Sequence, residues 1–476
     1  MRSFITKQTI RKEINFMETK ELKEQLFYKK ESVYAKVNEE AIDAAYDFAH
    51  DYMKYLDDAK TEREAVDAAI VIAEAAGFKP YTLGQTLNVG DKCYYNNRGK
   101  NLFLFTIGSE DLNNGIRISA AHIDSPRIDI KPVPLYEDEG MSFLKTHYYG
   151  GIRKYQWLAI PLALHGVVVK ADGTSVNVVI GEDDNDPVLY INDLLPHLAA
   201  NYSSKPLGSA IEGEKLNILM GSRPLGNEDN AIKLNTMKIL NDKYGIVEED
   251  FLTAELSIVP ALKARDVGLD RSLIGAYGHD DRVCAYPALK AIIDSADSKH
   301  TLMCILADKE ETGSDGNTGM QSDFMVDLID EIAIARGANP RVVRANSKCL
   351  SADVSAAYDP NFAEVFEKRN SALLSCGVVL TKYTGSRGKG STNDAHAEFI
   401  GFVRRAMAEY GVVWQAGELG RVDVGGGGTV AKYISMHNID VVDLGVPVIA
   451  MHAPFEVISK VDLYEAYRAF CAFCKF

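Results

Sequence analysis

Apolar residues recur at spacings of three and four between Ser32 and about Gly77, which predicts two amphipathic helices. Beyond Pro80 the apolar runs become short and alternate with polar residues. The run from Arg117 to His122 predicts a strand whose last inward side chain is a histidine. The positions that carry the helical pattern are Val37, Ala41, Ala44, Ala45, Phe48, Met53 and Leu56, then Ala65, Ala68, Ala69, Ile72 and Ala73.

The pattern changes again in the middle of the chain. From about residue 131 to 263, short β-branched runs such as VNVVIG alternate with Gly, Asn and Asp turns, which predicts an inserted β-rich domain. After Asp266 the pattern predicts a helix at 281–295, a strand at 302–306 and a last helical stripe at 463–473. Such alternation is typical of parallel strands joined by crossover helices.

These segments together predict an α/β fold. We expect a mixed, largely parallel sheet flanked by helices, formed discontinuously by residues 21–130 and 264–476. Residues 131–263 form the β-rich insertion between these two stretches. A length of 476 residues agrees with two domains, because it exceeds one typical hydrophobic core.

Composition and charge exclude several classes of protein. The chain is 46% hydrophobic and 25% charged, as in globular proteins, and no apolar run reaches the roughly eighteen residues that a membrane-spanning helix needs. The net charge of -15 argues against nucleic acid and anionic lipid as partners, because both attract cationic surfaces.

The cysteines and the N-terminus bear on location. Among seven scattered cysteines, Cys471 and Cys474 alone form a Cys-x-x-Cys pair, and this spacing favours one buried helical face over a redox or zinc site. Reduced thiols are typical of the cytoplasm, which is the location we expect. Residues 1–20 lack the continuous apolar segment of a signal peptide. We expect them to form a disordered leader, or the chain to start in effect at Met17.

Metal-ligand residue types follow several predicted strands. AHIDSP places His122 and Asp124 two residues apart, so in an extended chain both face one side and the carboxylate can orient the imidazole. GHDDR places Asp280 and Asp281 directly before a helical run. One of this pair can bind a metal, and the other can serve as a helix N-cap.

Three later segments add ligands. ILADKEETGS places Glu310 and Glu311 after a buried strand, and adjacent side chains diverge, so one can bind metal while its neighbour acts as a general base. LSADVS and PVIAMHAP place Asp353 and His452 after apolar runs, where a single polar residue is also common without a metal. In combination the segments supply two histidines and several carboxylates, the ligand set of a carboxylate-bridged pair of divalent ions.

At these residues the sequence resembles the aspartyl aminopeptidase family of dinuclear metallo-aminopeptidases, over nearly the whole chain from about Leu22. AHIDSP is similar to the family's AHxDSP, GHDD to G-x-D-N, and DKEETGS to DNEEVGS. SADVSAAYDPN is similar to SADxxHxxxPN, and MHAPFE to MHSxxE, in the same order. The resemblance implies a zinc-aminopeptidase-like catalytic domain that removes N-terminal residues from peptides.

The resemblance also implies a role for each residue. His122 and Asp353 would hold one metal ion and Glu311 and His452 the other, with Asp280 as the bridge. Glu310 would be the general base toward a metal-activated water, and Asp124 would orient His122. The cofactor implied is two divalent ions per subunit, expected to be zinc, with manganese or cobalt as alternatives.

The family assembles as a dodecamer built from dimers, and its inserted domain mediates the dimer contact. The counterpart here is about 131–263, and LLPHLAAN places His197 where relatives carry a histidine that reaches a neighbour's active site; an ordinary surface histidine is an equal alternative. Lys382 falls near the lysine that binds acidic side chains in the family. Ala356 and Asp359 depart from family histidines, so a preference for acidic residues is left open.

Other interpretations remain at this level. The glycine-rich stretch 425–429 either lines the substrate pocket with backbone amides or forms a plain tight turn. A related dinuclear deacylase or broad-specificity aminopeptidase is an alternative within hydrolases. A non-catalytic, self-assembling scaffold or cargo protein that retains the fold is an alternative of another class.

Overall fold

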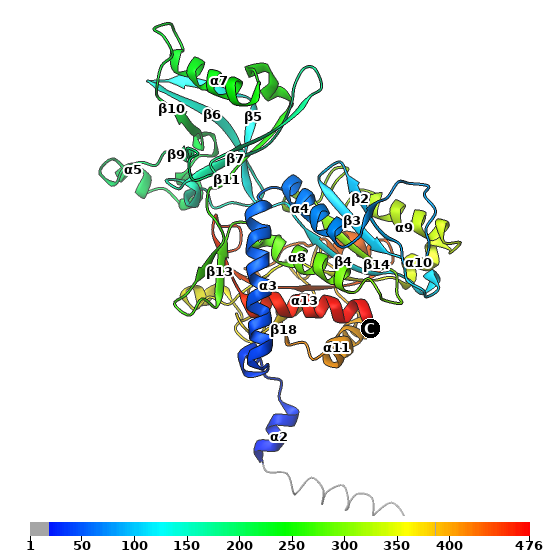
Figure 1. Cartoon of the computed structure of the whole chain (residues 1–476). Coiled ribbons are helices and arrows are strands. Elements are labelled where there is room, and N and C mark those ends of the chain that lie inside the picture. The colour runs from blue at the N-terminus through cyan, green and yellow to red at the C-terminus, as the bar shows by residue number, and fades with distance from the viewer. Residues whose placement is uncertain (1–18, 386) are drawn as a thin grey trace, which may run out of the picture.

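The computed structural model describes residues 19–385 and 387–476, so most of the expected leader lies outside the described residues. Two parts are apparent in Figure 1: a helix-flanked sheet, and a separate β-rich part at the top of the view. The described chain begins with helix α2 (Thr19–Leu26), which extends away from the rest. Within the described ranges, no helix is both long and apolar enough to cross a bilayer.

A nine-stranded mixed sheet forms the centre of the larger part, in the order β1-β2-β3-β14-β4-β15-β19-β17-β18. Its four middle strands β14, β4, β15 and β19 run parallel. The prediction of a mixed, largely parallel sheet is therefore confirmed. The strands are β1 (Lys79–Pro80), β2 (Lys92–Asn97), β3 (Asn101–Thr106), β14 (Leu302–Ala307), β4 (Arg117–His122), β15 (Lys348–Ser351), β19 (Asp440–Gly445), β17 (Val378–Thr381) and β18 (Trp414–Ala416).

The sheet has apolar residues on both faces, as a sheet covered by helices requires. In β14, Cys304 and Leu306 join one buried cluster while Met303 and Ile305 join the other, so alternate side chains face opposite layers. The first cluster includes residues of α3 (Glu39–Asp58), α4 (Glu62–Ala75), α8 (His279–Asp294), α11 (Ala397–Glu409) and α13 (Lys460–Lys475). The second includes residues of α9 (Phe324–Ala335), α10 (Pro340–Asn346) and α12 (Ala431–Ser435).

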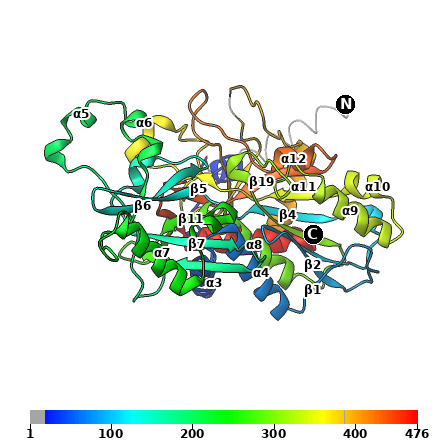
Figure 2. The ribbon, with the colours of Figure 1, turned by 90° about the horizontal axis from the view of Figure 1, so that it is seen from above.

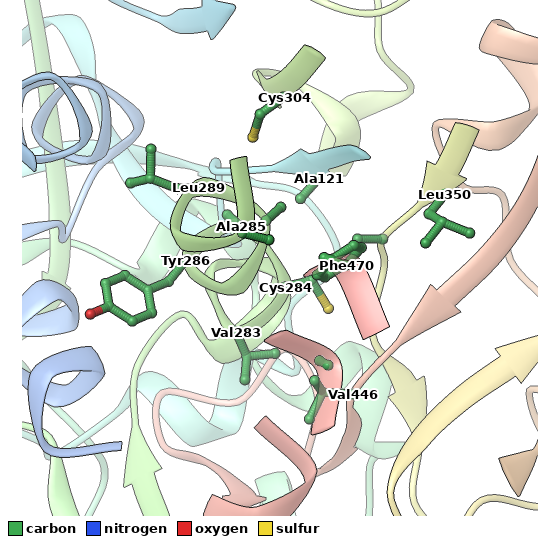
Figure 3. Close-up of a cluster of buried hydrophobic side chains, with 14 of the residues drawn as sticks. Ala121, Val283, Cys284, Ala285, Tyr286, Leu289, Cys304, Leu350, Val446 and Phe470 are labelled. Carbon is green, nitrogen blue, oxygen red and sulfur yellow. The ribbon is translucent and has the colours of Figure 1, made fainter. Parts of the chain in front are cut away.

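Figure 3 shows the middle of the first cluster, where Phe470 of α13 lies between Cys284 of α8 and Leu350 of β15. Phe470 is fully buried, and truncating such a ring to alanine costs about 3 to 5 kcal/mol. All seven cysteines are unpaired. Cys474 is buried in this cluster and Cys471 packs against it, which confirms the predicted apolar face of the last helix.

The N-terminal helices begin where their sequence provides caps. The side chain of Asn38 accepts the backbone N–H of Ala41 at the start of α3. Thr61 and Glu64 form a reciprocal capping box at the start of α4. The predicted pair of amphipathic helices is thus confirmed, with its boundary at the turn between residues 58 and 62.

The second part is a seven-stranded antiparallel sheet with its own core, which includes Trp157, Leu164 and Phe251. Helix α7 (Ala231–Tyr244) contributes Leu240 to this core. The strands, in sheet order, are β8 (Ser175–Ile180), β7 (Leu162–Val169), β11 (Ala254–Pro260), β5 (Arg127–Asp138), β6 (Met141–Tyr149), β10 (Ile218–Gly221) and β9 (Tyr190–Ile191). In Figure 2 short helix α5 (Ala200–Ser203) lies on a loop that extends away from this sheet.

A third sheet of five short strands adjoins the C-terminal segment, in the order β12-β13-β21-β20-β16. It pairs strands from three distant stretches of the sequence. The sequence pattern did not predict it, because its strands are too short to show a period. They are β12 (Arg265–Val267), β13 (Leu273–Ala276), β21 (Glu456–Ser459), β20 (Pro447–Ile449) and β16 (Ser355–Ala356).

A buried histidine connects the seven-stranded sheet with a helix that covers the nine-stranded sheet. His165 of β7 is 2% exposed; its Nδ1 lies 2.7 Å from Glu64 of α4 and its Nε2 lies 3.0 Å from Glu182. Burial alone would lower the pKa of His165, but the hydrogen bonds with Glu182 and Glu64 outweigh it and raise that pKa. The ring therefore links the seven-stranded sheet to α4, and the link is strengthened when the ring is protonated.

Replacing His165 by glutamine should destabilise the protein in a pH-dependent way. Since the folded pKa is raised, the stabilisation is fully present below the unfolded value of about 6.5 and is lost as pH rises through the folded pKa. We expect His165→Gln to lower the free energy of unfolding by about 1 to 3 kcal/mol near pH 6 and by less near pH 9. Urea unfolding at both pH values measures this, with exposed His50→Gln as the control. An equal loss at both pH values would contradict the protonated link.

Candidate metal centre

The predicted ligands converge at one edge of the nine-stranded sheet. Strands β14, β4 and β15 are parallel neighbours, so their carboxyl ends meet at this edge. Other ligands come from the start of α8 and from the loop between β20 and β21. The side chains that meet are His122 at the end of β4, Asp280 at the start of α8, Glu310 and Glu311 after β14, Asp353 after β15, and His452 before β21.

Asp280 lies between the two histidines. Its Oδ1 is 3.1 Å from Nε2 of His122, and its Oδ2 is 3.3 Å from Nε2 of His452. Two sets of potential ligand atoms share this carboxylate, and within each set the atoms lie within 4.8 Å of one another. The sets are His122, Asp280 and Asp353, and Asp280, Glu311 and His452.

One of these oxygens lacks a hydrogen-bond donor. Oε1 of Glu311 is buried without a hydrogen-bond partner. A buried carboxylate oxygen without a partner is costly, so it needs a cation or a proton. Imidazole nitrogen and carboxylate oxygen are both zinc ligands. The residues present therefore fit a divalent metal ion.

The pKa values show the same concentration of negative charge. Burial, together with neighbouring carboxylates, raises the pKa of Glu311 and of Asp353 well above the ordinary range, and raises that of Glu310 to about 7. Burial lowers the pKa of His452, but Asp280 outweighs burial and raises it to about 10. Burial opposes ionisation of Asp280 as well, yet His122 and His452 hold its pKa below the usual value.

Asp124 lies behind His122 and also contacts the loop after β14. Its Oδ1 is 3.3 Å from Nδ1 of His122, whose ring nitrogen also lies 3.0 Å from the backbone carbonyl of Asp124. The same carboxylate accepts the backbone N–H groups of Glu310 at 3.1 Å and Glu311 at 3.2 Å. Asp124 thus fixes an imidazole and two glutamates at once.

The structure distinguishes the two adjacent aspartates. Whereas Asp280 faces both histidine rings, Oδ2 of Asp281 accepts the backbone N–H of His122 at 3.3 Å. Burial raises the pKa of Asp281 well above its ordinary value. Asp281 therefore braces the end of β4, and Asp280 alone of the pair belongs to the ligand sets.

Sequence reasoning missed one buried acid, Glu456 on β21. Its Oε1 accepts the backbone N–H of His452 at 2.6 Å, and its Oε2 accepts that of Asp280 at 3.1 Å. Burial raises the pKa of Glu456 to about 8. Its place at the end of the MHAPFE motif was the available signal, but nothing in the sequence showed that it reaches back to Asp280.

Gly445 explains how Asp353 comes so close to β19. A Cβ on Gly445 would lie 1.7 Å from the carbonyl oxygen of Asp353, so only glycine permits this approach. The backbone is also held in the left-handed region at Lys309 (φ 67°) and at His452 (φ 66°). Such strain in residues with side chains is typical of functional sites.

A cavity of about 420 Å³ opens over the ligand sets. The glycine-rich stretch lines it at residues 426–428, which favours the pocket interpretation over a plain turn. Thr429, which follows, donates to the buried carboxylate of Asp443 at 2.8 Å, and this contact anchors the loop. The other lining residues include Val354, Thr381, Thr384, Leu419, Lys432, Tyr433 and Met451.

The two substrate-contact predictions fall outside this cavity. Lys382 pairs with Asp394 and lines a separate cavity with Tyr28 and Trp414, although its neighbour Thr381 lines the central one. His197 lies in a short 3-10 helix, Pro196–Leu198, next to α5, and is exposed. Within its own chain it does not line the cavity.

Comparisons with known proteins identify the family of the chain. Residues 55–474 match the family model described as Aminopeptidase I zinc metalloprotease (M18). A probable M18 family aminopeptidase 1 from Clostridium acetobutylicum is 52% identical over 424 residues, which cover 87% of this chain and 91% of that protein.

Solved structures give the same result. The crystal structure of an M18 family aminopeptidase from Thermotoga maritima superposes with a TM-score of 0.90 at 44% identity, covering 94% of this chain and all of that chain. The mApe1 dodecamer of S. cerevisiae shares the fold at 20% identity, with a TM-score of 0.73 over 90% of this chain and 96% of that chain. The chain belongs to the M18 family of zinc metalloproteases and is a metallo-aminopeptidase.

Proposed function

We propose that this aminopeptidase holds two divalent ions, with zinc as the expected metal. His122 and Asp353 would hold one ion, Glu311 and His452 the other, and Asp280 would bridge them. The observation that carries the proposal is the position of Asp280, with one oxygen directed at each histidine. When bound, such ions polarise a water molecule and the peptide carbonyl, and their positive charge compensates the buried carboxylates.

Glu310 is the general base in this proposal. Its side chain lines the cavity but belongs to neither ligand set, so it is free to face a water molecule. A carboxylate in this place can take a proton from the attacking water and return it to the leaving amine. Asp124 keeps this side chain in place through the backbone N–H of Glu310.

The substrate would be the N-terminus of a peptide. A free α-amino group would bind near the ions and the acidic side chains of the site, which would confine cleavage to the first residue. Among the described residues that line the cavity, Lys432 is the only lysine or arginine. The side-chain preference at the first residue thus depends on Lys432 rather than on Lys382 in this arrangement.

We also propose assembly into a homo-oligomer, as a dodecamer built from dimers. The inserted part 131–263 would make the dimer contact, and His197 would reach the active site of a neighbouring subunit. The exposed position of His197, on a loop that extends from the inserted sheet, supports this role. The yeast protein of the same fold, mApe1, forms a dodecamer. A cytoplasmic location, with all seven thiols reduced, completes the proposal.

Replacing Glu310 by glutamine should remove the base without removing a ligand. We expect kcat to fall by about 10² to 10⁴-fold, the usual contribution of general acid–base catalysis. Metal content, measured by elemental analysis, and assembly, measured by light scattering, should not change. Exposed Glu409→Gln is the matched control and should leave kcat unchanged. Full activity in the Glu310 variant would remove Glu310 from the mechanism.

Replacing Asp280 by asparagine should disrupt both ligand sets, because they share this carboxylate. We expect the chelated wild-type protein to take up two ions per chain and Asp280→Asn to bind fewer, with loss of hydrolysis. Asp281→Asn is the matched control, since Asp281 contacts the backbone of His122 and should retain both ions. Adding back zinc, manganese or cobalt, followed by calorimetry, identifies the preferred metal. Two tightly bound ions in Asp280→Asn would contradict the bridge.

A panel of aminoacyl nitroanilides should separate an aminopeptidase from a deacylase. Substrates with a free α-amino group should be hydrolysed and their N-acylated analogues rejected. Lys382→Met should leave the ratio of kcat/KM for acidic over neutral first residues unchanged, since Lys382 lies outside the cavity, and Lys432→Met should lower it. A ratio that responds to Lys382 alone would show that this lysine turns inward when substrate binds.

A further inference from the structure

The end of β6 and the two residues that follow it lie directly against the metal centre. This segment consists of Tyr149, Gly150 and Gly151, and each of them meets a different member of the site. Two of the three are glycines, and the hydroxyl of Tyr149 contacts Asp124, which belongs to neither ligand set. Their contacts point to a positioning role.

Tyr149 contacts the carboxylate that organises the site. Its hydroxyl donates to Oδ2 of Asp124 at 2.8 Å. This oxygen also accepts the backbone N–H of Glu311, while Oδ1 accepts that of Glu310 and lies beside His122. The hydroxyl of Tyr149 therefore holds the carboxylate of Asp124 in the orientation in which it contacts both the imidazole of His122 and the loop of Glu310 and Glu311.

The two glycines contact the other ligand set. The carbonyl oxygen of Gly151 lies 2.8 Å from Nδ1 of His452, which leaves Nε2 of that ring facing Asp280. A Cβ on Gly150 would lie 3.2 Å from Cβ of Glu311, and one on Gly151 would lie 3.3 Å from Nδ1 of His452. The segment passes so close to Glu311 and His452 that side chains there would press on both.

The ring of Tyr149 is held in place by Arg127, which belongs to a cluster of ion pairs. The guanidinium of Arg127, whose Cα is paired with that of Tyr149 across β5 and β6, lies 4.1 Å from the centre of the Tyr149 ring. Arg127 also pairs with Asp129 at 2.8 Å and with buried Glu62 of α4 at 2.9 Å. Burial alone would raise the pKa of Glu62, but Arg127 and Lys100 lower it to about 2, so the pair stays ionised.

We propose that Tyr149 is a positioning residue of the metal centre, and that the segment Tyr149–Gly151 holds the two ligand sets in register from the inserted sheet. Tyr149 acts through Asp124 on His122 and on the loop of Glu310 and Glu311. Gly151 acts on His452. This inference rests on the proposed ligand assignment, and it gives the inserted sheet a part in catalysis within a single chain.

The test compares Tyr149→Phe with Tyr148→Phe, which removes a hydroxyl from the exposed preceding residue. Removing a group that orients metal ligands costs about 10- to 100-fold in metal affinity or activity. We expect Tyr149→Phe to raise the half-saturating zinc concentration in calorimetry about tenfold, and to lower kcat at saturating zinc with KM within about twofold. The visible absorption of the cobalt-loaded protein should change in Tyr149→Phe and not in Tyr148→Phe.

A second variant tests the other end of the segment. Gly151→Ala places a methyl group against His452 at a residue whose φ is not in the left-handed region, so the backbone tolerates it. We expect this variant to bind one of the two ions more weakly and to keep the affinity for the other ion within about twofold of the wild-type value.

The outcomes are distinguishable. If Asp280→Asn loses metal while Tyr149→Phe keeps wild-type zinc affinity, kcat and cobalt spectrum, the ligand assignment stands and the positioning role is refuted. A lower melting temperature in Tyr149→Phe with unchanged metal binding and kinetics likewise assigns Tyr149 a merely structural role. If Asp280→Asn retains both ions, the ligand assignment itself fails, whatever Tyr149→Phe shows.

Discussion

The need to neutralise negative charge in a buried place governs this structure. Asp280, Glu311 and Asp353 are gathered at the ends of parallel strands, where burial disfavours their ionised forms. Without bound cations these groups can stay close together only when some of them carry a proton, as the raised pKa values of Glu311 and Asp353 indicate. The rest of the fold holds the members of the site together.

Hydrogen bonds from backbone N–H groups to buried carboxylates hold much of the site in place. Asp124 takes the N–H groups of Glu310 and Glu311, Asp281 takes that of His122, and Glu456 takes those of Asp280 and His452. Each of these carboxylates lies behind the ligands and fixes a main-chain segment rather than an ion. The site is thus surrounded by further acids, which are themselves buried.

The sequence predicted the parts of this site that lie in local patterns. A short alternating run located β4, a continuous apolar run located β14, and spacing located α3 and α4. Residue type singled out His122, the pair Asp280 and Asp281, Glu311 and His452. The sequence could not show that Glu456 meets Asp280 or that Tyr149 meets Asp124, because these contacts join residues 176 and 25 positions apart in different elements. The surroundings of Lys382 were equally hidden, because Thr381 at the end of β17 lines the central cavity while Lys382, the next residue, lines a separate one. The division into catalytic and dimerisation domains stays a prediction.

The proposed ligands are spread from His122 to His452, and Glu456 of β21 holds the backbone of two of them, Asp280 and His452. Because a ribosome releases a chain from its N-terminus onward, a nascent copy that ends before β21 lacks one proposed ligand and the acid that positions another. In the proposed arrangement such a copy has an incomplete site, so it would not hydrolyse the peptides around it.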